Sequence, residues 1–83
     1  MDAQQVQELV AAGIENVDVA VEGGGGKFQV RAVSPAFAGL SKVRKQQLVY
    51  GCLNEHIASG AIHAVEMQLF TPEEWAELQN SGS

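Results

Sequence analysis

The amino-acid sequence predicts one small α+β domain, in which a three-stranded mixed sheet carries its helices on one face. The 83-residue chain has room for a single domain and for no second one. Segments with helical periodicity and segments with strand-like alternation follow one another in the order α-β-β-α-β-α. A helix separates the second predicted strand from the third, and this connection favours a parallel pair of strands.

The first element is predicted to be a helix. Asp2 fits its N-cap, and Val6, Leu9 and Val10 form an apolar stripe at the spacing i, i+3, i+4. Gly13 fits the end of this helix, because glycine adopts the left-handed backbone conformation at low cost.

A hairpin of two strands is predicted next. Apolar residues alternate with polar or small ones from Val17 to Val21, and in the second strand Phe28, Val30 and Ala32 share one face. The glycines at positions 23–26 interrupt the alternation. The two strands are therefore expected to pair antiparallel around a flexible glycine loop.

The longest predicted helix covers Lys42–Ala58. A short irregular stretch at 34–40 leads into it, and Ser41 fits its N-cap. Apolar residues recur every four positions from Val49 to Ile57 and form the stripe that faces the core. Gly60 is expected to end the helix.

The third predicted strand runs from about Ile62 to Phe70. Alternation places His63, Val65 and Met67 on the same face as the core residues. His63 lies at the start of the strand, at the edge of the sheet rather than its centre. Spacing alone favours a structural role for this histidine.

The last helix has the clearest start signal in the chain. Thr71 fits the N-cap, Pro72 the first helical position and Glu74 the third, which completes a capping box. Phe70 and Trp75 have the spacing of a hydrophobic staple. A short helix is therefore expected to begin at Pro72.

Composition limits the function classes. No run of 18 apolar residues occurs, so no membrane span is predicted, and the acidic start is unlike a signal peptide. The single cysteine excludes an intrachain disulfide, and a cytoplasmic location is expected. The domain is expected to cover residues 1–79, with the last helix ending near Leu78 and a disordered tail at 80–83. A core this small leaves little material for a catalytic cleft, so no enzyme activity is expected.

The basic residues of this acidic chain lie together in the sequence. No carboxylate occurs between residues 23 and 54, and this segment holds all the cations: Lys27, Arg31, Lys42, Arg44 and Lys45. The flanking segments hold all 10 carboxylates, so the net charge is −5. The basic segment could meet an acidic partner or phosphate groups. The alternative is a solvated helix start that the surrounding carboxylates balance.

Three familiar chemical patterns do not fit the sequence. Gly23–Lys27 lacks the spacing of a phosphate-binding loop, and a strand follows it instead of a helix. A nucleophilic cysteine–histidine pair does not fit either, because Cys52 lies on the apolar stripe of its helix, where a thiol is expected to pack as a small hydrophobe. His56 suits the C-terminal end of that helix as a surface residue. One cysteine, His56 and His63 are too few for a zinc site.

Three stretches of the sequence together resemble the BolA-like proteins. They are Phe37–Tyr50, Ile62–Val65 and Phe70–Trp75, and the resemblance extends over nearly the whole chain. Lys45-Gln46-Gln47 and Thr71–Trp75 are similar to the short bacterial branch linked to acid stress. The fold that this resemblance implies, a KH-like (class II) arrangement, agrees with the element order predicted above.

The resemblance implies a partner and a cofactor. BolA-like proteins pair with monothiol glutaredoxins, can share a [2Fe-2S] cluster with them, and are tied to iron homeostasis and stress response. The family's histidine ligand maps onto His63, and imidazole suits iron. A second ligand is usual between the first two strands, but here Gly23–Gly26 precede Lys27, and a protonated lysine cannot bind a metal. A cluster is therefore expected only when a partner shares it, and none on the chain alone.

Nucleic-acid binding, as a transcription regulator, is the alternative function. The KH-like fold favours it, some family members are described as such regulators, and Lys42, Arg44 and Lys45 could contact phosphates. Against it, KH modules use a clamp loop with two glycines, whereas residues 37–41 contain only Gly39. The net negative charge also weakens sequence-independent affinity. Lys27 and Arg31 join the three as candidate contacts to nucleic acid or a protein partner, and a weak homodimer is left open.

Overall fold

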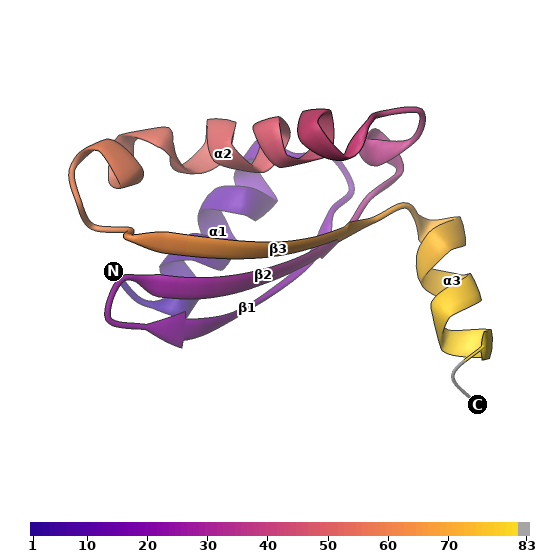
Figure 1. Ribbon diagram of the computed structural model, residues 1–83, viewed down its shortest axis with the longest axis horizontal. Coiled ribbons are helices and arrows are strands. Elements are labelled where there is room, and N and C mark those ends of the chain that lie inside the picture. Colours follow the sequence, from indigo (N-terminus) through magenta and orange to yellow (C-terminus); the bar gives the residue numbers. More distant parts are fainter. Residues whose placement is uncertain (82–83) are drawn as a thin grey trace.

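The computed structural model describes residues 1–81 and has the element order predicted from the sequence (Figure 1). The elements are, in chain order, α1 (Ala3–Gly13), β1 (Asp18–Gly24), β2 (Lys27–Val33), the 3-10 helix η1 (Pro35–Phe37), α2 (Lys42–Ala58), β3 (Ala64–Phe70) and α3 (Pro72–Ser81). The predicted α-β-β-α-β-α order is confirmed, and η1 occupies part of the stretch expected to be irregular. No helix within residues 1–81 is both long enough and apolar enough to cross a membrane.

The three strands form one mixed sheet in the order β1-β2-β3. β1 pairs antiparallel with β2, and β2 pairs parallel with β3, which confirms the prediction of a mixed sheet. β3 begins at Ala64, two residues later than the predicted start at Ile62. His63 therefore immediately precedes the strand, and β3 forms one edge of the sheet.

The core lies between one face of the sheet and helices α1 and α2 (Figure 1). Alternate residues of β2 face it, as the sequence predicts. Burying each large apolar side chain stabilises the fold by roughly 1.5–3 kcal/mol. The buried apolar residues are Val6, Val10, Ile14, Phe28, Val30, Ala32, Phe37, Val49, Leu53 and Ile62.

Capping bonds fix the starts of the helices. Asp2 Oδ1 accepts from the N–H of Gln5 at 2.9 Å, and the Gln5 side chain accepts from the N–H of Asp2 at 2.9 Å. Ser41 caps α2 through the N–H of Arg44 at 3.2 Å, and Gly60, with φ of +84°, follows its end. These caps confirm the predicted start of α1 and both predicted ends of α2.

The predicted cap of α3 is also confirmed. The N–H of Thr71 donates to Glu74 Oε1 at 2.8 Å, and the N–H of Glu74 donates to Thr71 Oγ1 at 3.2 Å. The rings of Phe70 and Trp75 lie 5.5 Å apart, as a hydrophobic staple requires. The helix continues to Ser81, beyond the predicted end near Leu78. Of the predicted tail, residues 80 and 81 are helical and residues 82–83 lie outside the described part of the chain.

Helix α3 does not join the layer formed by α1 and α2. It leaves the end of β3 and extends away from the sheet (Figure 1). Trp75 of α3 lies over the guanidinium of Arg31 at 5.0 Å, and Arg31 points to the face of β2 opposite the core. The prediction that the helices share one face therefore holds for α1 and α2, whereas α3 extends the molecule past the sheet.

Two predictions about glycines differ from the structure, one at Gly13 and one in the hairpin loop. Gly13 ends α1 without a left-handed conformation, and the positive φ of +51° belongs to Asn16. Gly24 still pairs with Lys27, so the loop predicted at 23–26 shrinks to a two-residue turn. Both turn residues, 25 and 26, have positive φ, as the tight hairpin turn that matches strand twist requires.

Candidate functional site

His63 is held at the end of the sheet beside the β1–β2 turn. Its backbone N–H donates to the carbonyl of Gly26 at 2.7 Å, and the N–H of Ala64 donates to the same oxygen at 3.1 Å. Lys27 lies opposite Ala64 in the parallel register, so His63 stands where the pairing of β2 and β3 begins. The residue is exposed although its backbone is anchored. The sheet thus presents an imidazole to the solvent from a fixed position.

Gly26 is buried although it lies in a turn, because the His63 ring covers it. A Cβ built on Gly26 would overlap Cδ2 of that ring and would lie 3.2 Å from Cγ and 3.4 Å from Nε2. The φ of +85° also favours glycine at this position. The turn and His63 therefore form one unit with Lys27 beside it, which we name the histidine end.

The other candidate metal ligands face elsewhere. Cys52 is half-buried on α2, its Sγ lies 3.4 Å from the carbonyl oxygen of Leu48, and burial raises the pKa of the thiol. A thiol in such surroundings is a poor source of thiolate. His56 borders a surface hollow together with Gln5 of α1. Within the described part of the chain, no group of three or more His, Cys, Asp or Glu side chains could hold a metal ion.

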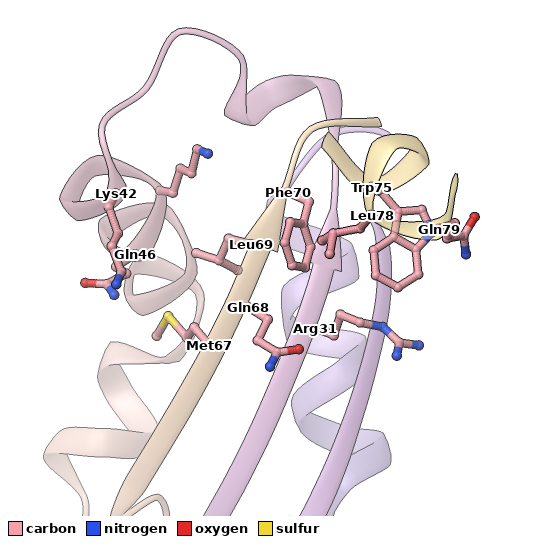
Figure 2. A pocket seen from close by; sticks show the side chains of 11 residues that line it. Arg31, Lys42, Gln46, Met67, Gln68, Leu69, Phe70, Trp75, Leu78 and Gln79 are labelled. Atoms are coloured by element: carbon pink, nitrogen blue, oxygen red, sulfur yellow. The ribbon is translucent and has the colours of Figure 1, made fainter. Parts of the chain in front are cut away.

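A cavity of about 680 Å³ lies at the opposite end of β3, between α2 and α3 (Figure 2). Its cationic lining residues are Arg31, Lys42 and Lys45, and its apolar lining residues are Met67, Leu69, Phe70, Trp75 and Leu78. Met67 and Leu69 belong to the core-facing side of β3, whereas Phe70 belongs to the other side. The cavity therefore wraps around the strand, and we name it the edge groove.

The cations of the edge groove differ in their partners. Lys45 Nζ lies 3.2 Å from Glu74 Oε1, and this ion pair ties α2 to α3. Hydrogen bonds from the backbone of Thr71 and from Lys45 lower the pKa of the Glu74 carboxyl. Arg31 stacks on Trp75. Within residues 1–81, Lys42 has no carboxylate partner.

The structure divides the basic segment identified in the sequence. Arg31, Lys42 and Lys45 meet at the edge groove, whereas Lys27 lies at the histidine end. Arg44 is exposed on α2 and does not line the groove. Sequence reasoning missed the apolar wall of the groove, because it assigned Trp75 to helix capping alone.

The comparisons with known proteins agree with this architecture. The family model described as "BolA-like protein" matches residues 7–74. The acid stress protein IbaG of Escherichia coli (strain K12) is 45% identical over 76 residues, which cover 92% of this chain and 90% of that protein. The relationship therefore extends over the elements that build both ends of the sheet.

Two further similarities concern the fold and part of the sequence. The structure of a bolA protein homologue from Coxiella burnetii has a TM-score of 0.81 and 27% identity, covering 92% of this chain and 97% of that chain. A stretch of 48 residues is 44% identical to the DNA-binding transcriptional regulator BolA of Haemophilus influenzae. That stretch covers 58% of this chain and 46% of the regulator.

Proposed function

Because the chain belongs to the BolA-like family, we propose that it is a stress-response and iron-homeostasis adaptor that pairs with a monothiol glutaredoxin. In this proposal the chain has no catalytic activity of its own, acts in the cytoplasm, and supplies His63 to a [2Fe-2S] cluster shared by the two proteins. The printed name of the Escherichia coli relative, an acid stress protein, supports the link to stress.

The placement of His63 is the observation that carries the proposal. Its ring lies on the β1–β2 turn and is open to solvent, so a second protein can approach it. The ring nitrogens have no hydrogen-bond partner within residues 1–81. Neutral imidazole is a suitable ligand for iron.

The ligand set of the chain fits a shared cluster and does not fit a cluster bound by the chain alone. A cluster with two irons needs four ligands. His63 is the one candidate at the histidine end, and its neighbour Lys27 is a cation that offers no lone pair. The proposal therefore assigns the remaining ligands to thiolates of the partner and of a bound small thiol.

The test combines the protein with a monothiol glutaredoxin under anaerobic conditions and follows the visible absorption of the complex. His63→Ala is expected to change the spectrum and to weaken the heterodimer. The matched control His56→Ala is expected to do neither. Lys27→His adds an imidazole beside the turn and is expected to stabilise the cluster. An unchanged spectrum and an unchanged affinity in His63→Ala would contradict the ligand assignment.

Nucleic-acid binding is the second candidate, favoured by one specific observation. Lys42, Arg44 and Lys45 all lie in the first turns of α2 at one end of the molecule. Lysine and arginine there oppose the helix dipole, so the stability of α2 itself does not explain their position, although Lys45 also pairs with Glu74 of α3. The partial match to a protein named as a DNA-binding regulator supports this candidate.

Salt dependence tests this second candidate. If these three side chains contact phosphates, affinity for duplex DNA should fall with salt at a log–log slope of about −0.9 per contact. Replacing all three by glutamine should abolish the binding. Micromolar binding that is insensitive both to salt and to the triple replacement would reject the mechanism.

A further inference from the structure

β3 presents backbone hydrogen-bonding groups at the edge groove. In a strand, the N–H and C=O groups of successive residues point to opposite edges. At the two ends of β3, Ala64 donates at 3.1 Å and Phe70 accepts at 3.0 Å on the side of β2. Alternation therefore turns the backbone groups of Met67 and Leu69 away from β2, toward the cavity that these residues line.

This edge lacks the usual protection. Proteins commonly guard an edge strand with lysine, proline, a bulge or a covering segment. The one charged residue of β3 is Glu66, which lies 3.4 Å from Gln29 on the open face of the sheet. Within residues 1–81, no hydrogen bond from another element reaches the outward backbone groups of Met67 and Leu69. A cavity of about 680 Å³ lies there instead.

The two flanks of the edge groove differ in chemistry. Figure 2 shows β3 between α2, which bears Lys42 and Gln46, and α3, which bears Trp75 and Leu78. Lys42 gives the α2 flank a positive charge, in a protein whose net charge is −5. Trp75 and Leu78, together with Phe70 of β3, give the α3 flank its apolar surface, and the Arg31 guanidinium lies 5.0 Å from the Trp75 ring.

We propose that the edge groove binds an extended segment of a partner protein in which acidic and apolar residues alternate. The segment adds a strand to β3, and its successive side chains point to opposite flanks. Its carboxylates meet Lys42, and its apolar side chains fill the space lined by Trp75 and Leu78. A second copy of this chain is a poorer occupant, because its own β3 offers a single carboxylate. His63 does not line the edge groove, so this proposal is independent of cluster sharing.

The test uses a fluorescein-labelled octapeptide of alternating aspartate and leucine. A control peptide of the same composition has its aspartates and leucines in two separate blocks. Fluorescence anisotropy is expected to show saturable binding of the alternating peptide and much weaker binding of the control. Amide hydrogen exchange is expected to slow at Met67 and Leu69 but not at Gln68, whose backbone already bonds to β2. If the peptide binds without slowing amide exchange at Met67 and Leu69, the proposal that it adds a strand to β3 is overturned.

Charge reversal provides a matched pair of variants. Lys42→Glu is expected to lower the affinity for the alternating peptide roughly tenfold. Glutamate suits the first turn of a helix, so this change does not threaten the fold. Lys27→Glu makes the same change at the histidine end and is expected to leave peptide affinity unchanged, as is His63→Ala. Equal affinity in Lys42→Glu and the wild type, or loss of binding in His63→Ala, would overturn the proposal.

Two other occupants give different results. A second copy would protect Met67 and Leu69 without peptide, increasingly at higher protein concentration, with dimers seen in sedimentation. An oligothymidylate that binds the groove in a Lys42-dependent manner, while the alternating peptide does not bind, would assign the surface to nucleic acid. Either result would overturn the proposal of an acidic–apolar partner segment.

Discussion

At the scale of single residues, Glu74 connects three parts of the molecule. Its Oε1 accepts from the N–H of Thr71 at 2.8 Å and from Lys45 Nζ at 3.2 Å. The bond from the Thr71 backbone, followed by that from Lys45, lowers the pKa of the carboxyl below its ordinary value of 4.5. One carboxylate thus caps α3 and ties it to α2.

We expect the charge of Glu74 to stabilise the fold at neutral pH and to lose this effect in acid. A carboxyl whose pKa is lower in the folded state contributes stability above its unfolded pKa, and the contribution fades as pH falls through the folded pKa. Glu74→Gln keeps an oxygen acceptor for the Thr71 N–H but removes the charge. In urea unfolding, its midpoint should lie below that of the wild type at neutral pH and converge with it below the ordinary glutamate range.

Glu73→Gln is the control for this titration. Glu73 lies in the same helical turn, and neither Thr71 nor Lys45 forms a hydrogen bond with it. Its difference from the wild type should be smaller at neutral pH. A gap between Glu74→Gln and the wild type that stays constant across pH would assign the effect to packing and not to charge.

At the scale of the elements, α1 and α2 lie in close contact where Gly13 meets Cys52. A Cβ built on Gly13 would overlap the Sγ of Cys52. This contact explains the glycine at the end of α1, which does not use a left-handed conformation. The sequence placed the end of the helix correctly, but the reason lies in a contact with a residue 39 positions away in the chain.

We expect Gly13→Ala to have opposite effects in two backgrounds. Alanine in a helix normally stabilises it by roughly 0.5–1 kcal/mol relative to glycine. In the wild type the added methyl group must displace the Cys52 side chain, so the free energy of unfolding should fall instead of rising. In Cys52→Ala the methyl group has space, and the usual gain should return. A double-mutant cycle measures this coupling, and equal effects in both backgrounds would contradict it.

The helix starts of this fold follow from local patterns, whereas the length of the hairpin turn and the direction of α3 depend on contacts with other strands and helices. The caps at Asp2, Ser41 and Thr71 involve residues three positions away, so a sequence pattern suffices to predict them. The glycine turn was predicted too long, because alternation of side chains says nothing about the backbone pairing of Gly24 with Lys27. The direction of α3 also could not be predicted, since it depends on Trp75 stacking over Arg31.

At the scale of the whole molecule, the sheet separates two candidate binding sites. His63 was identified as a candidate ligand through the family resemblance, and the structure places it beside the glycine turn. The basic segment was identified as one feature, yet β2 is long enough to put Lys27 and Arg31 at different sites. Strand register and helix direction decide which cations lie together. The spacing of charged residues along the chain predicts neither the register nor the direction.

The mixed pairing of β2 also sets the order in which the molecule can assemble. β1 and β2 are joined by a two-residue turn, whereas Gln29 and Glu66, which face each other across β2 and β3, are 37 residues apart. Closing the longer segment costs more chain entropy, and pairings between distant segments slow folding. The hairpin can therefore form early, but His63 reaches Gly26 only when β3 docks. The contact between His63 and the glycine turn therefore exists only in a molecule whose sheet is complete.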